Sequence, residues 1–260
     1  MHWFDAGVNQ FDQRLPIEQT LHRAELAGVA YMCVIATEES EWQPSLSWQR
    51  QYPERLCCTL GVHPHNADNV SADWITTLHL LALQNNVAAI GECGLDYNRM
   101  FSSRDNQLNV FEQQLTLASQ LDLPVYLHER DAFNDQYALL NHYINDLSGG
   151  LVHCFTSHKN HLKAYVDLGL YIGITGWVCD PKRGVELREA LNYLPLDRLV
   201  LETDAPYLFP KGLKPRQRNN QPAFLPHIAA QVAALKNVSV EQLSEVSIIN
   251  TKQLLWRNND

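Results

Sequence analysis

Residues 87–96 read VAAIGECGLD, and the expected fold class follows from this stretch. Its first four residues, Val87 to Ile90, are all apolar, with no alternation between apolar and polar positions. Strands that are covered on both faces show this pattern, and such strands are typical of parallel sheets flanked by helices. The stretch then continues into polar residues, including Glu92 and Asp96. We therefore interpret it as a buried parallel strand that ends in carboxylates.

Similar short apolar or β-branched runs recur along the chain, roughly 30 residues apart. They are Trp3–Val8, Val29–Ala36, Leu56–Val62, Val87–Cys93, Val125–His128, Leu151–Phe155, Tyr171–Thr175 and Leu199–Thr203. Segments with helical periodicity lie between them, and the clearest is Ser102–Leu121, with Ser102 and Asp105 as a capping box at its start. Eight strand and helix units in 260 residues predict an α/β fold of the (β/α)8 TIM barrel type, whose usual size is about 250 residues.

The chain beyond the eighth run predicts additional C-terminal helices, over Ala223–Leu235 and Val240–Trp256. No linker, low-complexity tract or charge block interrupts the sequence, so we expect residues 1–260 to form a single domain. A doubly wound open sheet is the alternative interpretation. The first run is not followed by a G-x-G-x-x-G loop, which favours the barrel.

Composition limits the kinds of function that the chain can have. Hydrophobic residues make up 45% of the chain and charged residues 19%, which is typical of a soluble globular protein. No apolar run approaches the roughly 18 to 20 residues of a membrane-spanning helix, and no leader segment precedes the first strand. The six cysteines lie in apolar runs without a disulfide pattern. We therefore expect a cytoplasmic protein with reduced thiols and no membrane partner.

The net charge of −9 argues against a broad basic surface of the kind that binds nucleic acid through phosphate contacts. An anionic substrate would need a local positive centre, such as a metal ion.

Five of the apolar runs end in residues that can bind a metal. In a TIM barrel the C-terminal ends of the strands build the active site. A lone histidine in an apolar run is more often a core residue, but a buried carboxylate is costly unless it is paired or coordinated. Mixed nitrogen and oxygen ligands suit Mg²⁺, Mn²⁺ or Zn²⁺. The residues concerned are His63, His65, Glu92, Asp96, His128, His153 and Asp204.

Six ordered motifs at these strand ends resemble one known family. They read GVHP from Gly61, GECGLD from Gly91, PVYLH from Pro124 with RDA from Arg130, HCFT from His153, GITG from Gly173 and ETDAPY from Glu202. Together they are similar to the TatD-type metal-dependent deoxyribonucleases of the amidohydrolase-like barrel superfamily. The resemblance covers essentially the whole chain.

The resemblance implies a (β/α)8 barrel that hydrolyses phosphodiester bonds with a divalent metal, as a 3′-to-5′ exonuclease on single-stranded DNA and RNA. It implies Glu92, His128 and His153 as metal ligands, with Asp204 as a further ligand or as the general base that acts on a metal-activated water. We expect His63 to contact the phosphate or to assist the leaving oxygen. A part in DNA repair goes with this activity.

The sequence departs from most of the family at the end of the first strand. Most members carry His-x-His there, whereas this chain has Gly7 and Asn9. Glycine has no side chain to bind a metal, so one of two metal positions is weakened. The same pattern resembles the subgroup that contains TatD itself. We expect one firmly held divalent ion, Mg²⁺, with Mn²⁺ or Zn²⁺ as alternatives, and a second ion that binds weakly.

Substrate contacts are predicted around the same mouth. The segment directly after the strand-eight motif carries four positive charges, either as a solvated loop or as a loop that steers nucleic acid: Lys211, Lys214, Arg216 and Arg218. His65 either contacts the substrate or only caps a helix or holds a loop, and Arg130 pairs either with a phosphate or with the neighbouring Asp131. Four aromatic residues near strand ends either stack on unpaired bases or pack at the rim: Tyr97, Phe101, Trp177 and Tyr207. Glu202 shares the side of Asp204 and is expected to orient a ligand.

Two other functions remain open at this point. A small-molecule amidohydrolase or lactonase would use the same barrel and metal chemistry, because a fold does not fix a function. The missing His-x-His, and the missing lysine at the fourth strand end where a bridging carbamate would form, argue against it. A scaffold or binding protein would not explain the strand-end carboxylates and histidines. We expect a monomer whose partner is a single-stranded DNA or RNA substrate.

Overall fold

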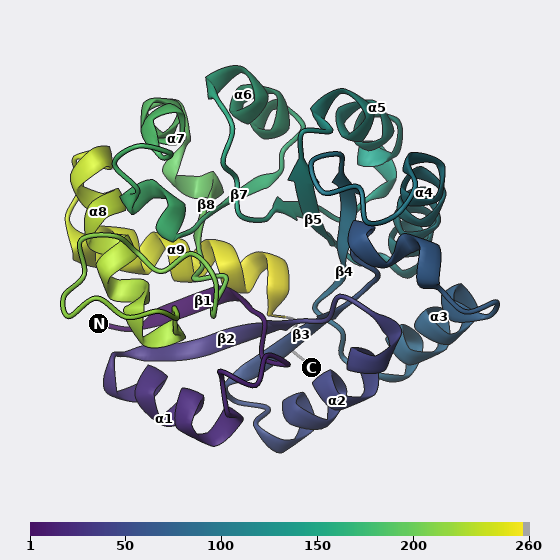
Figure 1. Cartoon of the computed structure of the whole chain (residues 1–260), viewed down its shortest axis with the longest axis horizontal. Helices are drawn as coiled ribbons and strands as arrows, with labels where there is room; N and C mark the ends of the chain where they lie inside the picture. The colour runs from purple at the N-terminus through teal and green to yellow at the C-terminus, as the bar shows by residue number, and fades with distance from the viewer. Residues whose placement is uncertain (257–260) are drawn as a thin grey trace.

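Eight parallel strands form one sheet in the computed structural model, which describes residues 1–256. The strands are β1 (Trp3–Val8), β2 (Val29–Ile35), β3 (Leu56–Leu60), β4 (Ala89–Asp96), β5 (Val125–Arg130), β6 (Gly150–Val152), β7 (Tyr171–Ile174) and β8 (Leu199–Leu201). Each strand lies next to the one that precedes it in the sequence. Figure 1 shows that the sheet curls into a barrel with the helices outside it. The predicted (β/α)8 TIM barrel is confirmed.

Helices alternate with the strands around the outside of the barrel, and the last helix lies across the end where the strands begin. Those in residues 1–256 are α1 (Ile17–Leu26), α2 (Glu39–Gln51), α3 (Trp74–Gln84), α4 (Arg104–Leu121), α5 (Phe133–Tyr143), α6 (Lys159–Asp167), α7 (Val185–Leu191), α8 (Leu225–Lys236) and α9 (Val240–Leu255). Short 3₁₀ helices are η1 (Pro64–Asn69), η2 (Ile144–Asp146), η3 (Gly176–Cys179), η4 (Leu196–Arg198) and η5 (Pro222–Phe224). The two predicted C-terminal helices are therefore present as α8 and α9.

The start of α4 differs from the prediction. Ser103, not Ser102, caps this helix, because the Ser103 hydroxyl accepts a hydrogen bond from the main-chain N–H of Asn106 at 3.4 Å. Ser102 has a different role. Its hydroxyl donates to the carbonyl of His65 at 2.9 Å and accepts from the N–H of Asp68 at 3.0 Å. The serine therefore ties the loop after β4 to η1, next to the histidines that follow β3.

The strand ends also differ from the prediction where the chain enters the site. β4 continues to Asp96, because its last residues pair with β5 and place Asp96 opposite Arg130. β8 ends at Leu201, before the predicted end at Thr203. The N–H of Glu202 still donates to the carbonyl of Ile174 on β7 at 3.2 Å, whereas Thr203 and Asp204 bond to β1.

The barrel closes between β8 and β1 largely through a buried carboxylate. The main-chain contact is an isolated bridge, together with the N–H of Asp204, which donates to the carbonyl of Gly7 at 3.0 Å. The Asp5 carboxylate on β1 accepts from the N–H of Thr203 at 2.8 Å and from its hydroxyl at 2.5 Å. Asp5 is fully buried, and burial raises the pKa of its carboxyl to about 8. This seam leads directly into the residues that follow β8.

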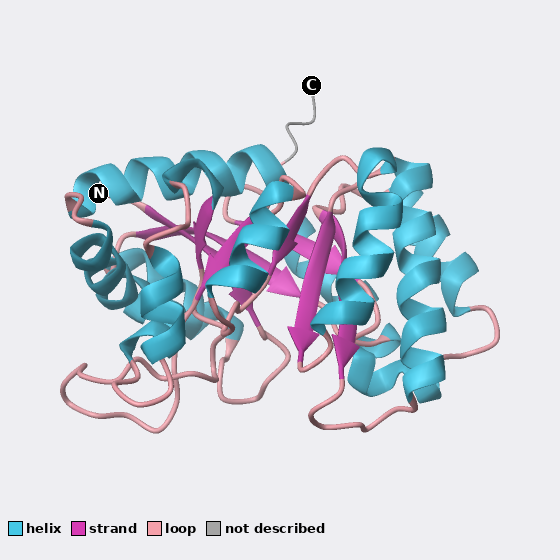
Figure 2. Ribbon diagram, turned by 90° about the horizontal axis from the view of Figure 1, so that it is seen from above, coloured by secondary structure: helices cyan, strands magenta, loops and turns pink. Residues whose placement is uncertain are grey.

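The two ends of the barrel are built differently. Figure 2 shows the strand arrowheads pointing to the side where the long loops lie, while the N-terminus lies on the opposite side. At that opposite end α9 is fastened to the start of β8, because the amide of Asn250 donates to the carbonyls of Leu196 and Leu199, both at 2.8 Å. Within residues 1–256, no helix has the length and apolarity that a membrane crossing requires. The loop end is therefore where a site can form.

Candidate metal centre

Glu92 lies in the middle of a histidine cluster at the loop end of the barrel. It belongs to β4, and its side chain is buried. One carboxylate oxygen, Oε1, lies 2.9 Å from Nδ1 of His128, 3.5 Å from Nε2 of His63 and 3.9 Å from Nε2 of His153. These histidines come from β5, from the start of η1 after β3, and from the end of β6. One carboxylate thus faces three imidazoles that different strands deliver.

Among residues 1–256, two groups of side chains have ligand atoms close enough to hold a metal ion. The groups are His63, Glu92 and His128, and His153, Cys154 and Asp204. Within each group the ligand atoms lie within 4.8 Å of one another. Nε2 of His153 lies 3.7 Å from Oδ1 of Asp204 and so joins the two groups. The structure brings together the four residues predicted as ligands, and it adds His63, which was expected to contact the phosphate or to assist the leaving oxygen.

The donor chemistry of these groups fits a divalent cation. Imidazole nitrogen and carboxylate oxygen are ligands that Mg²⁺, Mn²⁺ and Zn²⁺ accept in different proportions. Cys154 is the weak member, because burial together with Asp204 raises the pKa of its thiol, and the thiolate is the form that binds metal. A carboxylate as buried as Glu92 is costly unless charge surrounds it. A cation at this place would supply that charge.

Charge is shared across the cluster. Burial and the neighbouring His128 lower the pKa of His63 to about 3, so His63 is neutral. Burial opposes a charge on His128 and His153, yet the carboxylates beside them raise their pKa values to about 9 and about 10. The histidines in turn hold the pKa of Glu92 below its usual value, against the effect of burial. Burial raises the pKa of Asp204 to about 6. Metal ligands must be deprotonated, so a cation that binds here displaces protons from the histidines.

Glu202 and Tyr126 fix the orientation of His153. The Nδ1 of His153 lies 2.6 Å from Oε2 of Glu202 and 2.8 Å from the hydroxyl of Tyr126, which itself donates to Glu202 at 2.9 Å. All three side chains are buried. Because Nδ1 is engaged on this side, Nε2 is left facing Glu92 and Asp204. Such outer carboxylates set the ring orientation of metal-binding histidines.

A second carboxylate, Asp96, orients the histidines on the other side of the cluster. Its Oδ2 lies 2.8 Å from Nε2 of His65 and 3.3 Å from Nε2 of His128. Asp96 is almost completely buried, while the side chain of His65 is partly exposed. His65 therefore reaches the cluster through Asp96, and it lines the same cavity as the candidate ligands.

The place of the first missing histidine is occupied by the groups that hold His153. A Cβ atom on Gly7 would lie 2.8 Å from Oε2 of Glu202 and 3.0 Å from Cδ1 of Ile35, and closer still to the hydroxyl of Tyr126. Contacts below 3.0 Å are essentially never made by real Cβ atoms. A side chain at position 7 is therefore incompatible with the Tyr126 and Glu202 network as it stands.

Asn9, at the second missing histidine, bonds to a candidate ligand. Its side-chain amide donates to Oδ1 of Asp204 at 2.7 Å. From the sequence alone, Asn9 counts only as the loss of a ligand. In the structure it holds the Asp204 carboxylate in place from the first strand.

Gly7→Ala is expected to destabilise the protein by about 1–3 kcal/mol, the usual cost of adding volume to a packed interior. The loss arises because the new methyl group displaces the Tyr126 hydroxyl and Glu202. Urea denaturation of wild type, Gly7→Ala, Tyr126→Phe and the double variant measures it. The effect of Gly7→Ala should be smaller in the Tyr126→Phe background, where the hydroxyl is absent. Equal effects in both backgrounds would show that the Tyr126 hydroxyl is not the group that excludes a side chain at position 7.

Only some of the predicted substrate-binding residues line the cavity of the site. His65 and Arg130 line the cavity of the site. Lys211 does not extend freely toward it, because its Nζ forms a 2.8 Å ion pair with Oδ2 of Asp180. Arg216 and Arg218 are exposed and do not belong to the lining of this cavity.

Some residues of the site carry no sequence pattern that would have marked them. Tyr126 lies inside an apolar strand run, where an aromatic residue is usually part of the core. Its hydroxyl belongs to the site only because it donates a hydrogen bond to Glu202. Asp5 lies near the start of β1, and its partner Thr203 is distant in the sequence. A buried acidic residue within the first apolar run was the one available indication.

A parallel (β/α)8 barrel with histidines and carboxylates gathered at its C-terminal mouth defines a barrel hydrolase of the metal-dependent kind. The comparisons with known proteins agree with this class. The family model described as TatD related DNase matches residues 4–256, and the chain belongs to this family.

Relatives and solved structures match over nearly the whole length. A protein of Rahnella sp. (strain Y9602) named 3′-5′ ssDNA/RNA exonuclease TatD is 46% identical over 258 residues, which covers 96% of this chain and 97% of the relative. One of the same name from Erwinia tasmaniensis is 43% identical over 255 residues, covering 96% and 98%. The crystal structure of YJJV, a TatD homologue from Escherichia coli K12, superposes with a TM-score of 0.90 at 28% identity, covering 98% of both chains.

Proposed function

We propose that this protein is a divalent-metal-dependent 3′-to-5′ exonuclease that hydrolyses phosphodiester bonds of single-stranded DNA and RNA. The names of its relatives support the substrate and the polarity. The observation that carries the proposal is the position of Glu92, whose buried carboxylate faces three imidazoles while Asp204 lies 3.7 Å from one of them. A phosphodiester is an anion, and a cation-binding centre is what this acidic chain offers it.

The residues of the cluster divide into three roles in this proposal. Glu92, His128 and His153 hold the cation, and Asp204 completes the set. When bound, the metal neutralises charge on the phosphate and lowers the pKa of water. Asp204 removes the proton from the attacking water, since a pKa near 6 suits a base at neutral pH. His63, which is neutral, contacts the phosphate or assists the leaving oxygen.

We further propose Mg²⁺ as the resident ion, with Mn²⁺ and Zn²⁺ as the alternatives. One ion is held firmly. A second ion is held weakly, because position 7 has no side chain and Asn9 already donates to Asp204. The proposal extends to a monomer in the cytoplasm with a part in DNA repair. All six cysteines lie in the described residues and are free, as expected in a reducing compartment.

Cleavage of a 5′-labelled single-stranded oligonucleotide tests the function. The purified protein is incubated with EDTA, Mg²⁺, Mn²⁺ or Zn²⁺, and a Glu92→Ala variant serves as control. The expected result is a metal-dependent ladder that shortens from the 3′ end and is absent from the variant. If wild type and variant behave alike with every metal, the nuclease proposal fails, and simple esters, lactones and amides become the substrates to assay.

Removing the charges of Arg216 and Arg218 is expected to raise KM for the oligonucleotide a few-fold. Both side chains are exposed in an otherwise acidic protein, so they can steer the strand toward the mouth. The slope of log KM against log salt concentration should fall by about 0.7 for each phosphate contact that is lost. Arg23→Ala/Arg50→Ala removes the same charge from α1 and α2 and is the matched control. An unchanged salt slope in Arg216→Ala/Arg218→Ala would mean that the loop takes no part in binding.

A further inference from the structure

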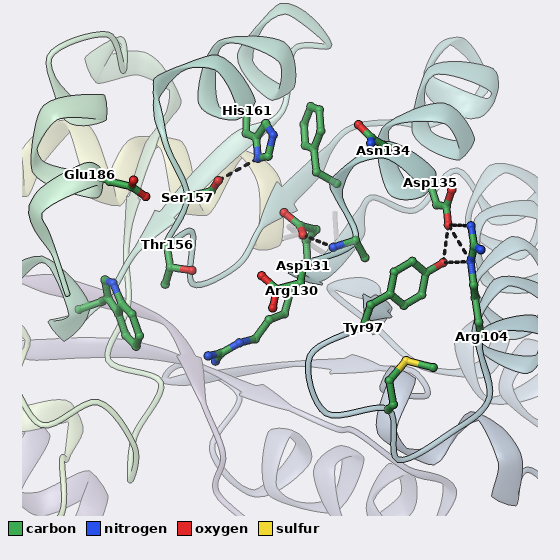
Figure 3. Close-up of a pocket in the computed structure, with 15 residues that line it drawn as sticks. Tyr97, Arg104, Arg130, Asp131, Asn134, Asp135, Thr156, Ser157, His161 and Glu186 are labelled. Carbon is green, nitrogen blue, oxygen red and sulfur yellow. Dashed lines mark hydrogen bonds and ion pairs between the residues drawn. The ribbon is translucent and has the colours of Figure 1, made fainter.

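Two cavities meet at the mouth of the barrel. The first, about 740 Å³, contains Glu92, His128, His153 and Asp204. The second, about 910 Å³, lies over the ends of β5, β6 and β7, and Figure 3 shows its lining. Four residues line both: Glu129, Arg130, Thr156 and Trp177. The second cavity is therefore a direct extension of the candidate metal centre, and its size is within the range of about 300–1,000 Å³ typical of ligand sites.

Arg130 stands at the junction without a carboxylate partner. Among residues 1–256 no ion pair or hydrogen bond is made by its guanidinium, and Figure 3 shows its side chain reaching into the open space between the walls. The other arginine of the second cavity, Arg104, is already neutralised, since its Nη2 lies 2.6 Å from Oδ2 of Asp135. Arg130 therefore offers an unpaired positive charge to a phosphate that enters the second cavity from the metal centre.

The interior of the second cavity repels a phosphate but suits a nucleoside. Its lining holds four carboxylates against two guanidinium groups: Glu129, Asp131, Asp135 and Glu186 against Arg104 and Arg130. Negative charge is thus unfavourable beyond Arg130. Carboxylates accept hydrogen bonds from the amino groups of bases. The wall also presents neutral rings, because Phe133 and His161 stack at 3.6 Å and burial lowers the pKa of His161 to about 4.

Trp177 supplies a fixed aromatic surface at the same junction. Its indole N–H donates to the carbonyl of Arg183 at 3.1 Å, and the Arg183 guanidinium lies 4.3 Å from the ring centre. The ring is thus held on one side by its own loop, while it lines both cavities. Stacking on such a ring is how proteins bind unpaired bases without regard to sequence.

We propose that the second cavity binds the nucleoside on the 5′ side of the scissile phosphate, with its base stacked on Trp177 and the next phosphate at Arg130. This rests on the proposed function and adds a site for the substrate strand. The strand on the 5′ side has to continue out of the enzyme. With the next phosphate held at Arg130, the base enters the second cavity while the backbone stays at the junction of the two cavities and does not cross the carboxylates of the second.

Comparison of two substrates tests the site. One is a single-stranded oligonucleotide, and the other is bis(p-nitrophenyl) phosphate, which offers a diester but no base or second phosphate. Trp177→Ala and Arg130→Ala are each expected to lose about tenfold or more kcat/KM on the oligonucleotide beyond any loss on the small diester. Trp177→Phe should recover most of the difference, and Arg50→Ala, at the opposite end of the barrel, is the control. Equal losses on both substrates, or none on the oligonucleotide, would overturn the site.

A binding measurement separates this site from the proposed function. Anisotropy of a labelled oligonucleotide is measured with metal present in an Asp204→Asn background, with and without Trp177→Ala. Weaker binding with Trp177→Ala supports the second cavity, and equal binding overturns it. If wild type binds but does not cut the strand with any metal, the exonuclease proposal fails while the binding result still decides the site.

Discussion

Asp204→Asn is expected to lower kcat on a single-stranded oligonucleotide by about 10²–10⁴-fold, the usual contribution of a general base. The change removes the proposed base but keeps the shape of the side chain and one oxygen. That oxygen still accepts the 2.7 Å hydrogen bond from Asn9, so the fold and the residues around His153 should persist. Single-turnover rates with saturating Mg²⁺ measure the effect, and the melting temperature reports the fold.

The pH profile gives an independent check on Asp204. A base acts only when deprotonated, so at a metal concentration that saturates the site across the pH range the rate of wild type should rise with pH and level off once the pKa of Asp204 is passed. Burial raises that pKa to about 6, and a nearby cation can only lower it, so the rise should end by about pH 6 to 7. Asp167→Asn, on the exposed face of α6, is the matched control. An Asp204→Asn variant with wild-type turnover would remove this residue from the role of base.

Glu92→Gln is expected to remove the metal centre itself. Glu92 is the carboxylate that three imidazoles share, and an amide oxygen carries no charge to hold a cation among them. Residues that merely orient a ligand change metal affinity by about 10–100-fold, so the loss for the shared carboxylate should be at least about 100-fold. Metal content after dialysis and calorimetric titration with Mn²⁺ measure the affinity, and kcat/KM should fall in parallel.

Two further readouts make the Glu92 prediction specific. Glu189→Gln on the exposed surface of α7 removes the same charge and should bind metal like wild type. Denaturation of the metal-free proteins compares their folds, because a loss of metal that only follows unfolding would show there. Wild-type metal content in a folded Glu92→Gln protein would place the cation elsewhere, with the group of His153 and Asp204 as the remaining candidate.

Much of the fold was predictable because its pattern is local. A continuous apolar run such as Val87–Ile90 reports burial on both faces, and the residues that end such runs must lie together when the strands are parallel. This is why Glu92, His128 and His153 could be grouped from the sequence. The start of α4 was predicted one residue early, because Ser102 and Ser103 are equivalent as caps until Ser102 bonds across to η1.

The parts that could not be predicted depend on partners that are distant in the sequence. Lys211 has the same appearance as its neighbours in a basic segment, and its ion pair with Asp180 follows only from the packing of two loops. Tyr126 is ordinary in a strand until Gly7 leaves space for its hydroxyl beside Glu202. In the sequence Asn9 is only a missing ligand, and its hydrogen bond to Asp204 exists only because the seam brings the two residues together.

The seam between β1 and β8 also determines how much of the chain must be synthesised before the candidate site is complete. Asp5 and Thr203 are 198 residues apart, and Asn9 and Asp204 are 195 residues apart, in a chain of 260. Synthesis on the ribosome proceeds from the N-terminus, so β1 emerges before its partners Thr203 and Asp204 have been synthesised. A nascent chain can already contain His63, Glu92 and His128 before the proposed base, Asp204, has been synthesised. Products of premature termination before residue 204 therefore lack Asp204, which is both the proposed base and the partner of Asn9.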